Sequence, residues 1–299
     1  MLDFLSSEMG IRLVSFVGIL AFMSLWEAVA PRRTHVLKKT LRWPSNFGLV
    51  FINSILMRLI APLGAVGVAL FAESRGWGLL NQLMLPSVIS SLFAIIALDL
   101  AIYLQHRVFH AIPILWRLHM VHHTDLDCDV STGLRFHTVE ILISFGIKTS
   151  VVVLLGASPL AVLIFEVVLN GTAMFSHSNI RMPRPLDKPL RLILVTPDMH
   201  RVHHSVDCVE TNSNFGFNLP WWDFLFRTYR SQPAEGHEEM HIGLPQFRHA
   251  SVQRLGEMLA MPFIAKNVGS TQQSPDEIDS EQMEANVDTR VTCTIADNF

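Results

Sequence analysis

The chain has 299 residues, of which half are hydrophobic and only 16% are charged, and its formal net charge is −3. Soluble domains carry about 25% charged residues. The composition therefore excludes a disordered chain, a broadly basic nucleic-acid binder and a disulfide-stabilised secreted module. Three cysteines form no CxxC pair, and an odd number cannot pair fully within one chain. The excess of apolar residues indicates a membrane protein.

Three apolar segments in the first hundred residues are candidates for membrane spans. Leu13–Trp26 is uncharged, Phe47–Phe71 contains a single charge, and Leu79–Leu98 contains none. A helix of about 20 apolar residues crosses the hydrocarbon core of a bilayer, and a flanking arginine can extend a shorter one by snorkelling. We therefore expect three spans before residue 105.

A fourth apolar region, Ile141–Phe165, continues to Phe175 and is interrupted by Gly156 and Pro159. Glycine and proline at such a point end one helix and begin another. The pattern predicts a helical hairpin over 141–175 that either crosses the membrane twice or dips in and returns. The expected fold class is an all-α integral-membrane bundle of three spans and this hairpin, with a helical cap.

The charges of the loops predict which way the chain crosses the membrane. The loop between the first two spans is basic, whereas the next loop has Arg75 as its one base. The basic residues of the first loop are Arg32, Arg33, Lys38, Lys39 and Arg42. Because basic loops stay in the cytoplasm, we expect a multi-pass protein whose residues near His106 and after His177 lie on the cytoplasmic face.

The chain divides into three regions. Residues 1–105 hold the first spans and the basic loop. Residues 106–265 include the hairpin and a cytosolic cap with short helices. Residues 266–299 are polar and acidic, and we expect them to be a disordered tail.

Histidines are concentrated in three short boxes. The chain has 14 histidines, ten of them between His106 and His204. The boxes read HRVFH (106–110), HMVHH (119–123) and HRVHH (200–204), and a separate histidine follows the hairpin in FSHSN. The nine candidate ligands are His106, His110, His119, His122, His123, His177, His200, His203 and His204.

The spacing of these histidines is typical of metal coordination. Residues at i, i+3 and i+4 share a face of a helix, and each neutral imidazole offers one lone pair to a metal. Imidazole suits iron, zinc, copper and nickel, whereas calcium and magnesium prefer oxygen ligands. Nine ligands are too many for one ion and about right for two. Packed histidines without a metal would each need other hydrogen-bond partners.

Three further residues are candidates for supporting roles in this site. Asp99 lies two helical turns before His106 on the same face, so it is expected to accept the N–H of a ligand histidine. The alternative for Asp99 is a carboxylate at the water interface. Glu140 is a candidate for the same supporting role. His137 is an additional ligand, a group behind the ligands or a substrate contact.

The three boxes in this order resemble the sterol desaturase and fatty acid hydroxylase superfamily of membrane enzymes. The resemblance covers about Asp99 to Tyr229. It extends to DLAIYLQHRVFH (99–110), HHTDLDCDVSTGLRFHTVE (122–140) and HRVHHSVDCVETNSNFGFNLPWWDFLFRTY (200–229). Two positions depart from the family pattern: Thr138 stands where relatives often have proline, and Arg227 stands where glycine often precedes Thr-Tyr.

The resemblance implies a non-haem di-iron oxidoreductase in which the nine histidines bind two irons. Its co-substrate is O2, and its reaction is hydroxylation or desaturation of a membrane lipid such as a sterol, fatty acyl or sphingoid chain. The sequence contains no GxGxxG and no CxxCH motif. Electrons are therefore expected from an external donor, such as a ferredoxin, a cytochrome or a reduced pterin. No nucleic-acid partner is expected.

Other functions remain open at this point. Cleavage of alkylglycerol ether lipids uses similar boxes within the same superfamily. A histidine-rich metal-binding or transport protein would place ligands inside the spans, whereas these boxes follow the end of a span. A zinc hydrolase needs about three protein ligands. A non-catalytic relative with a structural metal is the last alternative.

Overall fold

The computed structural model describes residues 7–83 and 85–265. Within these ranges the regular structure is helical, and two isolated bridges, Pro31–Ile180 and Ser205–Ile242, are the β pairings. The helices are α2 (Glu8–Val29), α3 (Lys39–Ile60), α4 (Gly64–Ser74), α5 (Leu79–Gln82), α6 (Ser87–Ala111), α7 (Pro113–His123), η1 (Thr132–Leu134), α8 (Thr138–Leu155), α9 (Pro159–His177), α10 (Arg184–Leu190), α11 (Pro197–His203), α12 (Cys208–Thr211), α13 (Trp221–Leu225), α14 (Gly236–Glu239), η2 (Ala250–Gln253) and α15 (Leu255–Ile264).

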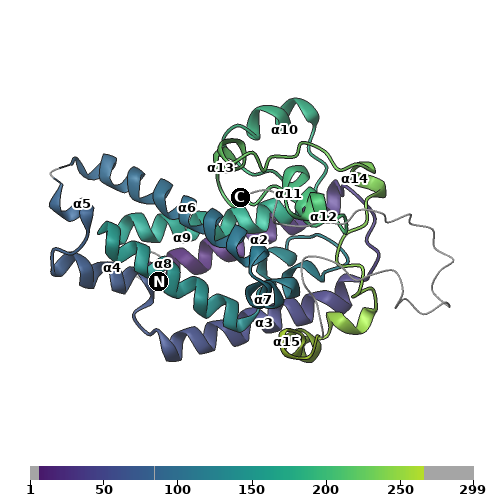
Figure 1. The fold of residues 1–299 in the computed structure, drawn as a ribbon, viewed down its shortest axis with the longest axis horizontal. Coiled ribbons are helices and arrows are strands. Elements are labelled where there is room, and N and C mark those ends of the chain that lie inside the picture. Colours follow the sequence, from purple (N-terminus) through teal and green to yellow (C-terminus); the bar gives the residue numbers. More distant parts are fainter. Residues whose placement is uncertain (1–6, 84, 266–299) are drawn as a thin grey trace.

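Five segments of the described chain are long and apolar enough to cross a membrane. They are α2, the α3–α5 segment Lys39–Gln82, α6, α8 and α9. The expected all-α membrane bundle is therefore confirmed. The long helices lie side by side, with α4 and α5 at one end of the bundle and α7, α11 and α14 at the other (Figure 1).

The second predicted span is not one straight helix. The expected helix over Phe47–Phe71 is broken between Ile60, where α3 ends, and Gly64, where α4 begins. Pro62 lies in this break. Proline has no backbone N–H and disfavours a helical conformation of the residue before it, so the apolar run bends here despite its uniform hydropathy.

The third predicted span is shifted along the chain. We expected Leu79–Leu98, but the helix before Gln82 is a single turn, and α6 runs from Ser87 to Ala111. Pro86 stands at the N-cap of α6, where its missing N–H costs no helical hydrogen bond. As a result, the HRVFH box is the last part of a membrane span rather than a segment that follows one.

The predicted hairpin consists of two long helices. Gly156 ends α8 in the left-handed conformation, with φ of 70°, and the Ser158 hydroxyl caps the first turn of α9. Gly78, with φ of 94°, lies against this turn so closely that a Cβ would stand 2.1 Å from the Gly156 nitrogen. Both helices are long enough to span, so the hairpin fits two crossings better than a shallow dip.

The bundle interior is apolar and finely packed. Small side chains, including Ala69, Ala94 and Ala161, let α4, α6, α8 and α9 approach one another closely around Phe165. One ionic group interrupts this interior. Glu166 on α9 binds Arg12 of α2 at 2.6 Å and also Lys148 of α8, which pins three helices together.

The remaining short helices form a cap at one end of the bundle (Figure 1). Two apolar clusters join it to the spans. Met120 of α7 packs with Leu49 of α3 and Met258 of α15, and Met174 of α9 packs with Val130 of the loop after α7. The predicted acidic tail, 266–299, lies outside the described residues.

Candidate metal centre

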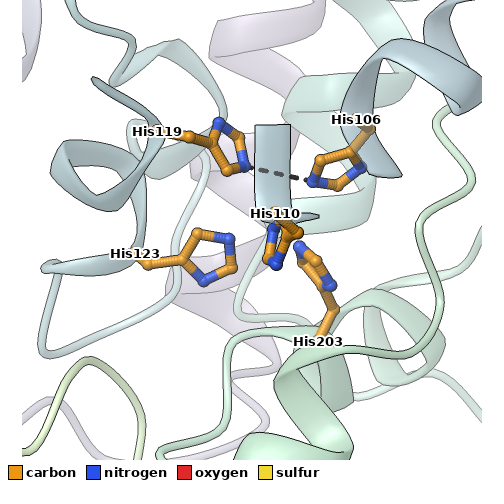
Figure 2. A group of neighbouring side chains, drawn as sticks. All are labelled: His106, His110, His119, His123 and His203. Atoms are coloured by element: carbon orange, nitrogen blue, oxygen red, sulfur yellow. Dashed lines mark hydrogen bonds between the residues drawn. The ribbon is translucent and has the colours of Figure 1, made fainter. Parts of the chain in front are cut away.

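The structure brings all nine predicted histidines together in two buried groups. In each group, one ligand atom per residue lies within 4.8 Å of the others. The five-histidine group, drawn in Figure 2, comprises His106, His110, His119, His123 and His203. The four-histidine group comprises His122, His177, His200 and His204. Each of the nine side chains is at most 3% exposed.

The second box divides its histidines between the two groups. His119 and His123 on α7 belong to the five-histidine group, whereas His122 belongs to the four-histidine group. Neighbouring residues on a helix of 3.6 residues per turn are about 100° apart. The adjacent pair His122 and His123 therefore faces two different groups, although the spacing of the box placed all three of its histidines on one face of the helix.

The third box divides in the opposite sense. His200 and His204 belong to the four-histidine group, and His203 belongs to the five-histidine group. The second and third boxes therefore each contribute to both groups. The first and last histidines of one box share a group with the middle histidine of the other box. The two candidate metal positions lie between the same pair of boxes.

Backbone carbonyls behind the rings fix several of the imidazoles. His106 Nδ1 donates to the Phe215 carbonyl at 2.8 Å, and His203 Nδ1 donates to the Ser213 carbonyl at 2.8 Å. His177 Nδ1 donates to the Ala173 carbonyl at 2.7 Å. A hydrogen on Nδ1 leaves the lone pair of a neutral ring on Nε2, so these rings present Nε2 to the centre of each group.

The His122–His177 pair tests whether the groups fit a metal. Nδ1 of His122 faces the Arg135 carbonyl at 3.2 Å, and Nδ1 of His177 faces Ala173. Both rings therefore carry their hydrogen on Nδ1, yet their Nε2 atoms are 3.0 Å apart. Two lone pairs cannot form a hydrogen bond with each other. A cation that accepts both is the simplest partner, so the residues fit a metal.

The same arrangement recurs in the five-histidine group. His119 Nδ1 lies 2.6 Å from Glu140 Oε1, and its Nε2 lies 3.1 Å from Nε2 of His106, whose Nδ1 is also occupied (Figure 2). Within residues 7–83 and 85–265, His110, His123 and His204 have no hydrogen-bond partner for either ring nitrogen. Buried polar atoms are normally paired. The unpaired nitrogens of these three rings are therefore available to bind a metal.

Burial keeps the cap histidines neutral. Removal from water, followed by the proximity of the other rings, lowers the pKa of four of them well below the usual value: His122, His123, His200 and His204. Burial likewise lowers the pKa of His203 to about 3. Metal binding requires neutral imidazole, so the rings are in their ligating form throughout the physiological range.

Glu140 has the contact that the sequence suggested for Asp99. Its Oε1 lies 2.6 Å from Nδ1 of His119. A carboxylate that accepts the N–H of a ligand histidine orients the ring and raises its basicity. Among the described residues, the hydrogen bonds of Asp99 go to partners other than histidine. Its Oδ2 accepts hydrogen bonds from the Trp222 indole at 2.8 Å and from the Leu219 amide at 3.2 Å. Asp99 therefore anchors the closing segment of the cap to α6 through Oδ2, and a supporting role in the metal site stays a prediction.

His137 lies in neither histidine group. Its Nδ1 accepts a hydrogen bond from the Val139 amide at 3.1 Å and so caps α8, and its Nε2 donates to the Leu259 carbonyl at 3.2 Å. Both nitrogens are thus used in joining α8 to α15. The arrangement gives His137 a structural contact and no free lone pair for a metal.

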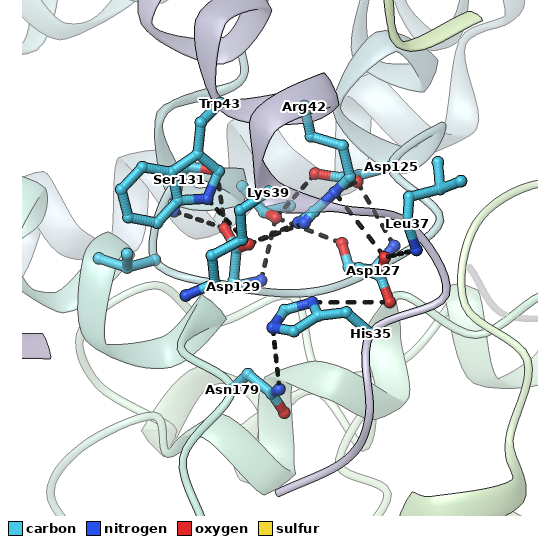
Figure 3. A network of polar contacts seen from close by, with 12 residues as sticks. His35, Leu37, Lys39, Arg42, Trp43, Asp125, Asp127, Asp129, Ser131 and Asn179 are labelled. Atoms are coloured by element: carbon cyan, nitrogen blue, oxygen red, sulfur yellow. Dashed lines mark hydrogen bonds and ion pairs between the residues drawn. The ribbon is translucent and has the colours of Figure 1, made fainter. Parts of the chain in front are cut away.

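A buried ionic network holds the loop that follows the second box (Figure 3). Arg42 of α3 donates to Asp125 at 3.0 Å and to Asp129 at 2.7 and 2.6 Å. Burial alone would raise the pKa of Asp129, but the Arg42 guanidinium together with hydrogen bonds from Ser131 and Trp43 outweighs burial and lowers that pKa. Asp127 accepts from the Val36 and Leu37 amides, both at 2.8 Å. The network ties the basic loop to the chain between His123 and Arg135.

Gly133 brings this loop against the four-histidine group. A Cβ at this position would stand 2.5 Å from the Ala173 carbonyl and 3.2 Å from His177 Nδ1. Only a glycine therefore lets η1 approach α9 at the turn that carries His177. The sequence contains no signal for this requirement, because glycine is common in polar loops whether or not another helix packs against it.

Asp223 holds the segment behind His106. Its two oxygens accept from the Phe215 and Gly216 amides, both at 2.9 Å, and its Oδ1 also accepts from the Thr228 hydroxyl at 2.7 Å. Since the Phe215 carbonyl receives the His106 ring, Asp223 positions that ligand candidate from a distance. Asp223 was not among the residues predicted from the sequence.

Comparison with known proteins agrees with this geometry. The fold and the two histidine groups define a multi-pass membrane protein with a candidate di-metal site. Residues 91–228, which contain all nine histidines, match the family described as Fatty acid hydroxylase. This region is therefore similar to the fatty acid hydroxylase family, a family of membrane di-iron lipid hydroxylases.

Similar characterised proteins act on different lipids, as their names state. The ornithine lipid hydroxylase OlsE of Rhizobium tropici is 32% identical over 52% of this chain and 46% of its own length. Human alkylglycerol monooxygenase is 30% identical over 46% of this chain and 30% of its own length. Human cholesterol 25-hydroxylase is 29% identical over 47% and 51%. The chain thus spans about half or less of these relatives. No solved structure matches it.

Proposed function

We propose that this protein hydroxylates a C–H bond of a membrane lipid with O2, using two irons held by the nine histidines. The observation that carries the proposal is the pair of buried Nε2 atoms of His122 and His177, which face each other at 3.0 Å with both Nδ1 hydrogens already in use. The similarity of residues 91–228 to the fatty acid hydroxylase family supports iron as the metal.

In this proposal the five-histidine group holds one iron and the four-histidine group holds the other. The irons, when bound, supply the activation of O2 and the removal of hydrogen from an unactivated carbon. The protein supplies the ligands, their orientation and a site without water. Region 106–265 contains every residue assigned to this work.

The chain's own contacts explain how the ligands stay in place. Carbonyls of Phe215, Ser213 and Ala173 hold three rings, and Glu140 holds a fourth. Because these acceptors are on different segments of the chain, the ligand set is assembled only when the cap closes on the spans. A pre-arranged ligand set would need no reorganisation to receive the metals.

We further propose that the histidine end faces the cytoplasm and takes electrons from an external donor there. The excess of Lys and Arg between the first two spans supports this orientation. The cap places the histidine groups at one end of the bundle, within reach of a soluble or membrane-bound donor protein or a reduced pterin (Figure 1).

Ether-lipid oxidation is the second candidate, because several similar proteins are alkylglycerol monooxygenases. Hydroxylation of the carbon next to an ether oxygen gives a hemiacetal, which separates into an aldehyde and an alcohol. The same histidine site would serve both reactions. The substrate alone distinguishes them.

The proposal is tested by comparing the lipids of cells that express the wild-type chain with those that express His110→Ala, under air and without O2. We expect a lipid species with one added oxygen atom, dependent on O2 and on His110. An increase in long-chain aldehyde with loss of ether lipid would favour the second candidate. Purified protein that converts lipid without iron would contradict both.

A further inference from the structure

A patch of exposed apolar side chains lies on the cap, outside the candidate spans. It is formed by α10 with the residues that follow it and by α13. The patch residues are Leu186, Leu192, Ile193, Trp221, Phe224 and Leu225, which are between 41% and 66% exposed. Monomeric soluble surfaces rarely gather large apolar side chains in this way, so the patch marks a contact with an apolar partner.

The two parts of the patch form one structural unit. The Trp221 indole on α13 donates to the Leu192 carbonyl at 2.7 Å. Phe224 packs on Tyr229, with ring centroids 4.5 Å apart, and the Arg191 guanidinium donates to the Ser231 carbonyl at 2.7 Å. Figure 1 shows α10 and α13 on one flank of the molecule.

This unit is fastened to the middle of a membrane-spanning helix. The Trp222 indole and the Leu219 amide both donate to Asp99 of α6, and Phe226 stacks on Tyr103 of α6 with centroids 5.5 Å apart. Asp99 is twelve residues from each end of α6, or about 18 Å at 1.5 Å per residue. The start of α13 therefore lies beside the span rather than beyond its end.

The surface of α6 at this depth is itself apolar and exposed. Ile96 and Leu104, within five residues of Asp99, are 37% and 43% exposed, as expected of side chains that face lipid. The patch is therefore at the same depth as a surface that the bilayer covers. A segment that does not span but lies along the bilayer boundary buries its apolar side in the acyl region.

The exposed charges of this unit are basic. Arg184, Lys188 and Arg227 are exposed, whereas Asp187 and Asp223 are buried and hydrogen-bonded. Long basic side chains near a membrane boundary extend toward lipid phosphates and are attracted to an anionic surface. Charge and apolar exposure therefore point to the same partner.

We propose that residues 184–194 and 219–227 lie in the leaflet next to the histidine end, with the patch in the acyl region and the three basic side chains on anionic headgroups. The unit would be an additional membrane contact made by the cap. It rests on the span assignment and not on the proposed catalytic function.

The proposal is tested by measuring the depth of single nitroxide labels in reconstituted protein. The background carries Cys208→Ser and Cys293→Ser, while Cys128 stays, because burial raises the pKa of its thiol and shields it from the label. Labels are placed at Leu225→Cys and Ile193→Cys. Ile96→Cys on α6 is the lipid control, and Glu239→Cys on α14 is the aqueous control.

In vesicles of phosphatidylcholine and phosphatidylglycerol, the labels at 225 and 193 should collide with O2 more than with a water-soluble nickel chelate, as the label at 96 does. A ratio equal to that at 239 would overturn the proposal. Low collision with both reagents, together with dipolar broadening between chains, would assign the patch to a second copy and would also overturn it.

The basic side chains are tested with the same labels. Removing phosphatidylglycerol should make the label at 225 shallower in the parent, and Arg184→Gln with Lys188→Gln should abolish this dependence. A depth that is independent of both changes would overturn the headgroup contact. Neither measurement requires iron or turnover. The depth of the labels therefore tests the membrane contact even if the protein does not have the proposed enzyme activity.

Discussion

The two histidine groups use the same helices but are supported differently. The five-histidine group has a carboxylate, Glu140, behind one ring and the Asp223-held closing segment behind another. The rings of the four-histidine group contact the carbonyls of Arg135 and Ala173 and the Ser176 hydroxyl, with no carboxylate among their hydrogen-bond partners in the described residues, and the group depends on the close approach of Gly133. One group is thus tuned by charge and the other by packing, so they should respond to different substitutions.

The largest effect is expected from removing one ring of either group. His110 and His204 have no protein hydrogen bond to lose, so their replacement by alanine removes a ligand and little else. We expect each variant to lose one of two irons per chain and to make no product above background. Metal analysis of purified protein checks this, with exposed His249→Ala as the control. Loss of both irons from both variants would contradict two separable sites.

The next effect concerns the carboxylate. Glu140→Ala removes the acceptor of the His119 ring and should weaken metal binding by about 10–100-fold. The loss should fall on the five-histidine group, whereas Glu140→Gln retains an acceptor oxygen and should lose less. Competition with a chelator measures the affinity of each iron. Equal weakening of both irons would break the distinction between the groups.

Substitution of a glycine should act on the other group. In Gly133→Ala the new Cβ meets the Ala173 carbonyl and His177, and overpacking of this kind typically costs about 1–3 kcal/mol. We expect a lower melting temperature and preferential loss of iron from the four-histidine group. Gly146→Ala is the matched control, because a Cβ there has nothing within 4 Å. Equal behaviour of the two variants would show that the close approach is unimportant.

The smallest effect is a dependence on pH. Burial raises the pKa of Asp223 to about 6 from its usual 3.8, so the folded protein holds this proton more tightly than the unfolded chain. The resulting stability is fully present below pH 3.8 and is lost as pH rises to about 6, by at most about 1.4 kcal/mol per pH unit. As pH rises through this window, the melting temperature of the wild type should fall relative to that of Asp223→Asn, which cannot ionise. A pH-independent difference would show that the carboxylate is ionised throughout.

The sequence predicted the ligand candidates because their spacing is local. Three boxes and His177 suffice to name the rings, and the structure gathers them all. The division into two groups is also within reach of helix geometry, since adjacent residues such as His122 and His123 point about 100° apart. Spacing does not predict the partner of Asp99, because Trp222 lies far along the chain. The local sequence around Asp99 is the same whether the carboxylate accepts from a histidine or from Trp222.

The spans were found from hydropathy, but their ends were not. Pro62 and Pro86 break runs that are uniformly apolar, so a rule that counts hydrophobic residues passes over the breaks. The backbone carbonyls that hold the rings have no sequence signal at all, because every residue has one. Gly133 and Asp223 belong to the same class: their importance lies in distances that only the folded chain defines.

The facing nitrogens of His122 and His177 also bear on how the protein matures in the cell. Until a cation or proton arrives, α7 and α9 bring two lone pairs to 3.0 Å, and this repulsion opposes their final approach. On the proposed function, iron supply should then act as a checkpoint on biogenesis, with newly inserted chains that lack iron degraded faster by quality-control proteases. A pulse-chase experiment with an iron chelator should show faster degradation of the wild-type chain and little change for His122→Ala.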